Sequence, residues 1–293
     1  MILLLDAGNS RIKWRVQQAG EVLASGAMPT HSESALDQTL HAALTALSFQ
    51  HAVVCSVAGA GVDAVVEAAI KASIKGVVKD VIKDAMNAAL HAGNHSTVPQ
   101  VQGGPSVNWL KPAANAYGLT NLYQPPESLG ADRYAALIAA HHRCLGACVV
   151  VNVGTAMTVD MLTNEGHFLG GFIVLGPDLM RASLHGGTAG VKAAITASAP
   201  APAAHSCAAE WPTTPEPTTT AIAVAQGIGY ALSGGVMEAC RRIQVAVGET
   251  PTVVLSGGAR AALRPYLSGT VIETDELVLE GLAWVARDLG YNA

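Results

Sequence analysis

The sequence has no stripe of basic residues and few charged side chains of either sign. Its 293 residues include 17 Lys and Arg against 22 Asp and Glu, which gives a formal net charge of −5. Because nucleic-acid binding depends on clustered positive charge, this composition argues against nucleic acid as the main partner. It does not exclude small anionic ligands, which need only a few local hydrogen-bond donors.

Recognisable targeting and membrane-spanning segments are also lacking. Residues 1–8 have no basic stretch before their apolar run, and this run meets Asp6 after five residues, unlike a signal peptide. No stretch reaches the roughly 18 uncharged apolar residues that a membrane helix needs. We therefore expect no membrane partner and a cytoplasmic location.

Cysteine is scarce, odd in number and scattered. Cys144 and Cys148 lie one helical turn apart, a spacing that can hold a metal ion. No other Cys or His stands at zinc-site spacing from them, so reduced and mostly buried thiols are the favoured interpretation. The same interpretation holds for the other three cysteines, which are Cys55, Cys207 and Cys240.

What the sequence has in quantity is aliphatic side chains and glycine. Half of the residues are hydrophobic, 13% are charged, 4% are aromatic, and 30 are glycine. This composition excludes a disordered chain and is typical of an α/β protein. The length is generous for one domain and sufficient for two domains that share a cleft.

Hydrophobic periodicity predicts strands and helices that follow each other along the chain. Residues 125–146 contain a predicted helix, and residues 170–184 a strand, a Gly-Pro turn and the start of a helix. Residues 94–109 and 195–220 are predicted loops, and residues 77–90 fit a strand and a helix equally well. Strands are further predicted at 1–8, 11–17, 51–59, 149–160 (a hairpin) and 252–258, and helices at 34–47, 62–72, 220–245 and from 276 onward.

Two segments occur twice in the chain, in the same order. LLLDAGNSRIK (3–13) resembles VVVNVGTAMTVD (149–160), and AVVCSVAGA (52–60) resembles TVVLSGGAR (252–260) when Ser56 is aligned with Ser256. Each half therefore begins with strand, polar turn, strand, and later contains an apolar strand that ends in Ser and small residues. Two matches in one order favour duplication over coincidence, with a matching turn on each wall of a cleft.

The repeated turns have the composition of phosphate-binding segments. Gly and small polar residues present backbone N–H groups to an anion with no side chain in the way. Asp6, at the end of a buried strand, is placed to hold Mg²⁺ directly or through water, and Arg11 or Lys13 can add positive charge. An ordinary hairpin turn is the alternative for DAGNS alone, but the pairing with NVGTAMT favours phosphate binding.

Asp132 in the segment LGADR is a candidate general base. An acid beside Arg133 at a helix start stays ionised, because the helix dipole and the cation favour its charged form. An ionised carboxylate next to a phosphate site can take the proton from an attacking hydroxyl. The alternative is a helix N-cap with a surface ion pair. Gly257 and Gly258, after a buried strand, permit close approach of a flat ring or a ribose.

Six segments together resemble one family, the type III pantothenate kinases. They are DAGNSRIK, GADRYAAL, NVGTAMTVD, GGFIVLGPDLM, SGGAR and ELVLEGLAW, which follow in order over nearly the whole chain. The resemblance implies an α/β fold of two duplicated ribonuclease-H-like (actin-like ATPase) domains around a central cleft, here residues 1–125 and 126–293. It also implies transfer of the ATP γ-phosphate to the terminal primary hydroxyl of pantothenate, the first step of coenzyme A biosynthesis.

The resemblance further implies Mg²⁺, a monovalent cation (K⁺ or NH₄⁺), a homodimer and a set of site residues. Asp132 matches the catalytic base and Asp6 lies near the metal. Tyr123 and Thr220 match substrate-contacting residues, with Thr220 uncertain by one position within PTTTAI. The remaining matches are Asp6, Ala7, Gly8, Asn9, Ser10, Arg11, Ile12, Lys13 and Thr155 for ATP, and Gly130, Ala131, Asp132 and Arg133 for pantothenate.

Asn152 departs from the family pattern. Many members carry Asp at this position, where it helps to bind the monovalent cation. Asn keeps an oxygen ligand but loses the negative charge, so the K⁺ dependence of this chain is open.

Two other functions are kept as alternatives. One is a kinase for another small hydroxyl substrate, and the other is a nucleotide-binding regulatory protein of the same fold.

Overall fold

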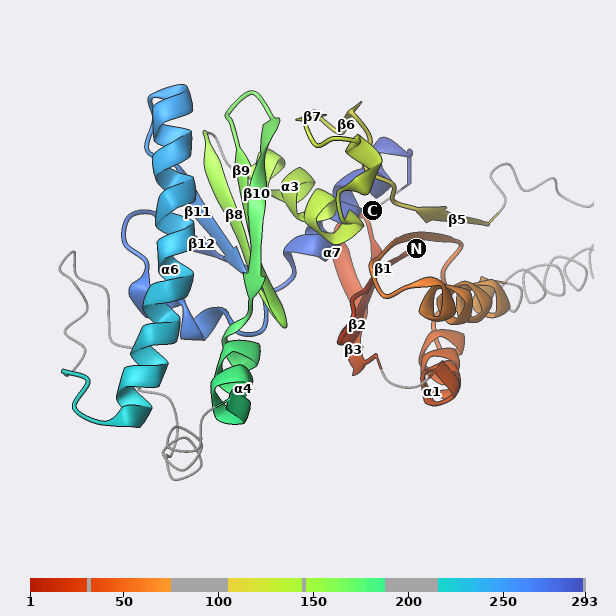
Figure 1. Ribbon diagram of the computed structural model, residues 1–293. Helices are drawn as coiled ribbons and strands as arrows, with labels where there is room; N and C mark the ends of the chain where they lie inside the picture. Colours follow the sequence, from red (N-terminus) through yellow and green to blue (C-terminus); the bar gives the residue numbers. More distant parts are fainter. Residues whose placement is uncertain (31–32, 75–104, 144–145, 188–215, 292–293) are drawn as a thin grey trace, which may run out of the picture. The chain divides into compact units, whose positions relative to one another are not determined.

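The computed structural model describes residues 1–30, 33–74, 105–143, 146–187 and 216–291, which form two compact units (Figure 1). Each unit contains one β-sheet with its own hydrophobic core. Unit 1 comprises Met1–Pro112, Gly130–Ala135 and Val278–Ala293, and unit 2 comprises Ala113–Leu129 and Ala136–Leu277. The domain bounds 1–125 and 126–293 stay a prediction.

The sheet of unit 1 has five strands in the order β3-β2-β1-β4-β5. The first three strands form an antiparallel meander, and β4 and β5 run parallel to β1. The carboxyl ends of β1 and β4 therefore lie at the same edge of the sheet. The strands are β1 (Ile2–Ala7), β2 (Arg11–Gln18), β3 (Glu21–Pro29), β4 (His51–Ser56) and β5 (Ser106–Trp109).

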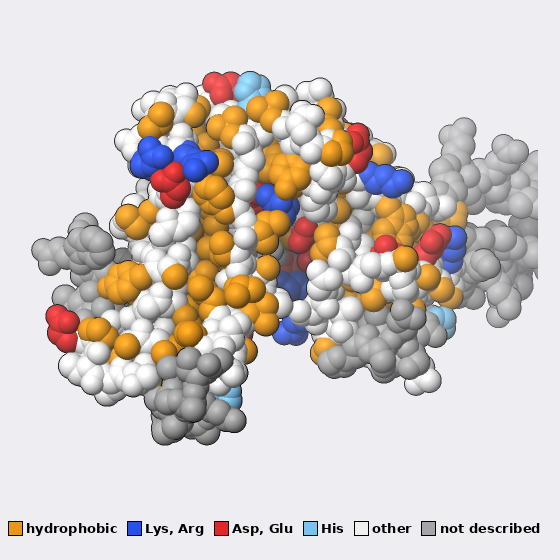
Figure 2. Space-filling model, viewed as in Figure 1, with side chains coloured by type: hydrophobic (Ala, Val, Ile, Leu, Met, Phe, Trp, Pro, Cys, Tyr) orange, Lys and Arg blue, Asp and Glu red, His pale blue; other side chains and the backbone are white. Residues whose placement is uncertain are grey.

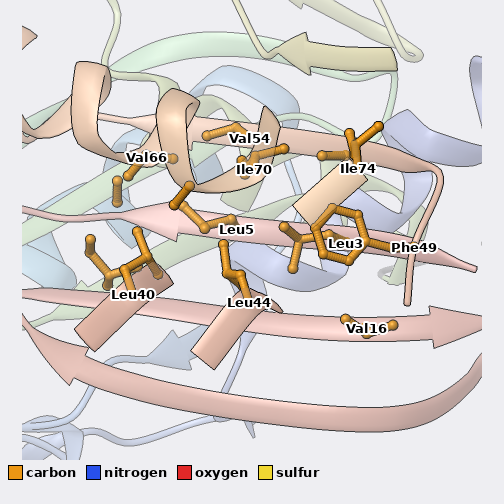
Figure 3. Close-up of a cluster of buried hydrophobic side chains, with 14 of the residues drawn as sticks. Leu3, Leu5, Val16, Leu40, Leu44, Phe49, Val54, Val66, Ile70 and Ile74 are labelled. Atoms are coloured by element: carbon orange, nitrogen blue, oxygen red, sulfur yellow. The ribbon is translucent and has the colours of Figure 1, made fainter. Parts of the chain in front are cut away.

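Helix α1 (Glu33–Thr45) and the helix at residues 60–74 cover this sheet. Figure 3 shows side chains from both helices meeting those of β1. Leu3 and Leu5 alternate along β1 toward this core, and Leu40 and Leu44 stand one helical turn apart on α1. All four are fully buried, and each stabilises the unit by roughly 1.5–3 kcal/mol. Helix α7 (Leu277–Asp288) adds a hydrogen bond from Arg15 Nη2 to Leu279 O of 3.3 Å.

The sheet of unit 2 has seven strands in the order β12-β11-β8-β9-β10-β7-β6. Strands β8, β9 and β10 form an antiparallel meander, and β11 and β12 are parallel to β8. The strands are β6 (Asn115–Ala116), β7 (Leu119–Asn121), β8 (Cys148–Val153), β9 (Ala156–Leu162), β10 (His167–Leu175), β11 (Thr252–Ser256) and β12 (Val271–Glu273).

The order and direction of β3-β2-β1-β4-β5 are repeated in β10-β9-β8-β11-β12, so the predicted duplication is confirmed. The pairing of β4 with β1 and of β11 with β8 is offset by one residue from the sequence alignment of Ser56 with Ser256. Cys55 is the β4 partner of Asp6, whereas Ser256 is the β11 partner of Asn152. Cys55 and Ser256 therefore occupy equivalent places when Asp6 is aligned with Asn152.

Helix α6 (Thr220–Val247) runs along one face of the unit 2 sheet, where it contacts β8, β9 and β10 (Figure 1). By length and composition it could also cross a membrane, which corrects the expectation that no segment qualifies. Ile228, Leu232, Val236 and Ile243 recur on the face that packs into the sheet core, as in a core helix of a globular protein. Helices α3 (Ala131–Arg143) and α4 (Pro177–Gly187) are the remaining longer helices among the described residues.

Most predicted elements are confirmed, with differences at short strands. Residues 106–109 form β5 rather than part of the predicted loop. Their sequence has no clear alternation of polar and apolar residues, and it is the parallel pairing with β4 that makes them a strand. The edge strands β3, β6 and β12, and the short strand β7 next to β6, are not among the predicted elements. The undecided segment 77–90 and nearly all of the predicted loop 195–220 lie outside the described residues. In the part of the chain that the structure describes, 3₁₀ turns lie at Pro126–Ser128, Arg260–Ala262 and Arg264–Tyr266.

Candidate functional site

Asp6 lies near the carboxyl end of β1, between Lys13 on β2 and Cys55 on β4. The Cys55 thiol donates a hydrogen bond to Asp6 Oδ1 at 3.4 Å. Burial raises the pKa of Asp6 from 3.8 to about 6, and the negative charge of Asp132 adds to the rise, while the Cys55 hydrogen bond and Lys13 oppose it. Because burial disfavours the ionised form of Asp6, a cation bound next to the carboxylate would stabilise that form.

Asp132 occupies the first turn of α3. Its Oδ1 accepts a hydrogen bond of 2.8 Å from the backbone N–H of Arg133, a residue that is only 6% exposed. Gly130 leaves room for this carboxylate, since a Cβ there would lie 2.6 Å from Asp132 Oδ1 and 3.7 Å from Val57 Cγ1. Val57 directly follows β4, so Asp132 lies near the edge at which β1 and β4 end.

Within unit 1 the structure thus brings Asp6 and Asp132 together. Among the described residues no group of three or more His, Cys, Asp or Glu side chains has metal-binding geometry. Mg²⁺ does not need such a group, since it is usually held by one or two carboxylates together with waters and substrate phosphates. The largely buried Asp6, with a second carboxylate nearby, fits a magnesium ion that arrives with a nucleotide.

The first glycine turn links β1 to β2. Gly8 N–H donates to Arg11 O at 3.0 Å, which closes the turn. Thr30, directly after β3, binds this turn with two hydrogen bonds: its N–H donates to Ser10 O at 3.0 Å and its hydroxyl to Gly8 O at 2.8 Å. Not every residue of the predicted segment Asp6–Lys13 presents its side chain there. Ala7 and Ile12 are fully buried in the core, whereas Asn9, Ser10 and Arg11 are exposed.

The second glycine turn, in unit 2, links β8 to β9. Gly154 N–H donates to Ala156 O at 2.9 Å, and Thr155 is exposed. Gly176 and Gly257, far apart in the sequence, both approach this turn. A Cβ on Gly176 would lie 2.0 Å from Gly154 O, and one on Gly257 would lie 2.2 Å from Val153 O. The tertiary structure thus gathers three predicted glycine motifs around one turn.

Asn152, the predicted cation ligand, is the second-last residue of β8 and so lies two positions before Gly154 of this turn. Its Oδ1 would lie 2.6 Å from a Cβ on Gly257, whose φ of +100° also favours glycine. The amide oxygen of Asn152 therefore lies against Gly257, where a larger residue would not fit.

Tyr123 and Thr220 both belong to unit 2, where Tyr123 packs against β10 and Thr220 begins helix α6. The ring of Tyr123 stacks on Phe168 of β10, with centroids 6.0 Å apart. Thr220 is exposed and is the first residue of α6. The neighbouring Thr219 is the N-cap, and its hydroxyl accepts a hydrogen bond from Ile222 N–H at 3.3 Å. Of these two hydroxyls, that of Thr219 is thus engaged in capping the helix.

Sequence comparison identifies the family. A sequence profile of the type III pantothenate kinases matches residues 2–104 and 77–242. A type III pantothenate kinase of Aromatoleum aromaticum is 36% identical over 288 residues, which cover 98% of both chains. The chain belongs to the type III pantothenate kinase family. Another such kinase, of an Azoarcus species, is 34% identical over 288 residues, or 98% of this chain and 90% of that one.

The fold of this type III pantothenate kinase also has relatives among solved structures. A Sinorhizobium meliloti protein assigned as a 2-dehydro-3-deoxygalactonokinase aligns with a TM-score of 0.51 and 18% identity, covering 99% of this chain and 97% of that one. At that identity the likeness shows the fold alone. This fold is the duplicated α/β architecture of sugar kinases and actin-like ATPases, so the predicted fold class is confirmed.

Two side chains at the site of this type III pantothenate kinase were missed in the sequence. Cys55 was interpreted only as a buried thiol, although its strand is parallel to β1 and ends at the same edge. Burial and the carboxylates of Asp6 and Asp132 raise the pKa of Cys55 well above its ordinary value, so it stays a hydrogen-bond donor. Thr30 carried no sequence signal, because its contact with the first turn depends on the unpredicted strand β3.

Proposed function

We propose that this protein transfers the γ-phosphate of ATP to the terminal primary hydroxyl of pantothenate, the first step of coenzyme A biosynthesis. The observation that carries the proposal is the pair of neighbouring carboxylates, Asp6 and Asp132, at the carboxyl edge of a sheet with a glycine turn. The membership of the type III pantothenate kinase family supplies the substrate class.

Asp132 is the proposed general base. It takes the proton of the attacking pantothenate hydroxyl, while its own position is held by the Arg133 N–H and by the space that Gly130 leaves. Asp6 is the proposed ligand of Mg²⁺, which neutralises negative charge on the phosphates when bound. Cys55 holds one oxygen of Asp6 and leaves the other free for the ion or its water.

The two glycine turns are the proposed ATP-binding segments. In the first, the exposed side chains of Asn9, Ser10 and Arg11 and the backbone of Gly8 can bind phosphate, with Lys13 adding positive charge. In the second, Thr155 is the proposed contact. The core-facing Ala7 and Ile12 are assigned a backbone contribution only.

For pantothenate, we propose contacts from the segment Gly130–Arg133, from Tyr123 and from Thr220. Thr220 is favoured over Thr219 because the hydroxyl of Thr219 already accepts the N–H of Ile222. Asn152 is the proposed ligand of a monovalent cation, K⁺ or NH₄⁺, through its amide oxygen.

We also propose that the protein is a cytoplasmic homodimer. Figure 2 shows hydrophobic side chains gathered over α4, β10 and α6 of unit 2. Exposed patches of this kind mark protein interfaces more often than bare solvent-facing surface. Exposed members of this apolar face are Ile173, Val174, Leu175, Leu179, Leu184 and Met237.

ADP release with Mg²⁺-ATP and K⁺, measured with and without pantothenate, tests the function. We expect strong turnover only when pantothenate is present. Asp132→Asn is expected to lower kcat about 10²–10⁴-fold with little change in ATP affinity, because the base acts on the acceptor hydroxyl. Asp178→Asn, in the first turn of α4, is the matched control and should leave kcat unchanged.

Other outcomes separate the alternatives. Equal losses of kcat and ATP affinity in Asp132→Asn would contradict its role as base. Turnover with a different hydroxyl acceptor in a substrate panel would indicate another kinase of this fold. ATP binding without turnover on any acceptor would indicate a regulatory protein.

A further inference from the structure

Asn121 is a buried polar residue that neither the sequence motifs nor the proposed mechanism uses. It is the last residue of β7, where it pairs in parallel register with Phe168 of β10, and it is only 4% exposed. A buried amide is retained at low energetic cost only when its donor and its acceptor both find partners.

Both ends of the Asn121 amide bind the loop that follows it. Its Oδ1 accepts a hydrogen bond from the backbone N–H of Tyr123 at 3.0 Å. Its Nδ2 donates to the backbone carbonyl of Pro126 at 3.1 Å. The side chain therefore spans the loop from within and fixes the backbone on both sides of residues 124 and 125.

The Tyr123 ring is held from a second side by the same strand pair. It stacks on Phe168, which is fully buried, at an interplanar angle of 20°. The backbone N–H of Leu122 donates to Phe168 O at 3.4 Å. The position of Tyr123 is thus determined by Asn121 through its backbone and by Phe168 through its ring.

Beyond Pro126 the loop is closed by its own hydrogen bonds and leads into the proposed substrate segment. The Ser128 hydroxyl donates to Pro125 O at 2.7 Å, and Leu129 N–H donates to Pro126 O at 3.3 Å. Gly130, the first residue of the GADR segment, follows directly. Because Leu129 N–H is bonded to Pro126 O, a displacement of this carbonyl also displaces Leu129, the residue before the GADR segment.

We propose that Asn121 is a positioning residue for pantothenate, which acts by fixing Tyr123 and the loop between Tyr123 and Gly130. The inference rests on the proposed function and deepens it, since it names the side chain that holds the substrate loop in place. It assigns Asn121 no contact with the substrate and no part in proton transfer.

The test measures KM for pantothenate and KM for ATP in Asn121→Ala. Loss of both hydrogen bonds frees the loop, so KM for pantothenate should rise about tenfold, whereas KM for ATP should stay within about twofold. Asn164→Ala, which removes an exposed asparagine from the turn between β9 and β10, is the control and should change neither constant.

A double-mutant cycle with Tyr123→Phe separates positioning from general stability. If Asn121 acts through Tyr123, the two changes are not additive, and Asn121→Ala should raise KM for pantothenate less than about twofold in the Tyr123→Phe background. A residue that only stabilises the fold would lower Tm and the active fraction, and would leave KM for pantothenate unchanged in both backgrounds. Additive effects, or an unchanged KM for pantothenate, would overturn the inference.

Asn121→Asp keeps the proposal testable if the alanine variant does not fold. It retains an acceptor for the Tyr123 N–H but has no donor for Pro126 O when ionised, so an intermediate rise in KM for pantothenate is expected. An unchanged KM for pantothenate in this variant would likewise overturn the inference. Absence of pantothenate turnover in the unmodified protein would refute the proposed function, and the inference with it. Normal turnover with unaffected Asn121 variants would refute the inference alone.

Discussion

Replacement of Asp6 by Asn should stabilise unit 1 while it removes the proposed metal ligand. Burial, reinforced by the charge of Asp132, raises the pKa of Asp6 from 3.8 to about 6. A shift of about 2 pH units corresponds to about 3 kcal/mol by which the folded state disfavours the ionised carboxylate. Because Asn still has to be buried at that position, we expect the variant to gain about 1–3 kcal/mol at pH 7.5.

The sign of the pH dependence follows from the raised pKa. Above about pH 6 Asp6 is ionised in both the folded and the unfolded chain, so the folded state bears the full free-energy cost of burying the charged carboxylate. Between about pH 6 and pH 4 the folded state binds the proton first, and the penalty disappears. The stability difference between Asp6→Asn and the unmodified protein should therefore be largest at pH 7.5 and small near pH 4.

Urea unfolding at a series of pH values, without Mg²⁺ or nucleotide, measures this difference. Tryptophan fluorescence is a suitable probe, because Trp14, Trp109 and Trp284 all lie in unit 1. Glu21→Gln, which neutralises an exposed carboxylate at the start of β3, is the control and should change stability by less than about 0.5 kcal/mol. A destabilised Asp6→Asn variant at pH 7.5, or a difference that does not vary with pH, would refute the reasoning.

Two further predictions concern the cation and the assembly. Asn152→Asp should make turnover more dependent on K⁺, because a carboxylate adds negative charge to the existing oxygen ligand; an unchanged activation curve at constant ionic strength would count against it. Ile173→Glu should raise the dimer dissociation constant in sedimentation equilibrium at least about tenfold, because it places a charge on a 60% exposed apolar side chain of β10. Val22→Glu, at an exposed apolar position of unit 1, is the control, and equal effects of the two changes would contradict an interface on β10.

The sequence by itself determined the longer elements and the repeated plan of the fold. Strands such as β1 and β8 are continuous apolar runs, and helices such as α1 carry a regular apolar face, so local patterns suffice to find them. The repeat of strand, polar turn and strand indicated the duplication that the order of both sheets confirms. The polar turn after the first strand and the acidic helix start in LGADR also indicated Asp6 and Asp132 as candidates, and both match the family motifs.

Only the tertiary structure decided which side chains meet. Cys55 reaches Asp6 because two parallel strands share one register, and Gly176 and Gly257 converge on the turn at Gly154 from distant parts of the chain. Asn121 binds both sides of the Tyr123 loop because the pairing of β7 with β10 buries it there. Sequence periodicity reports which residues are buried, but it carries no information on the partners that a polar group finds in the core.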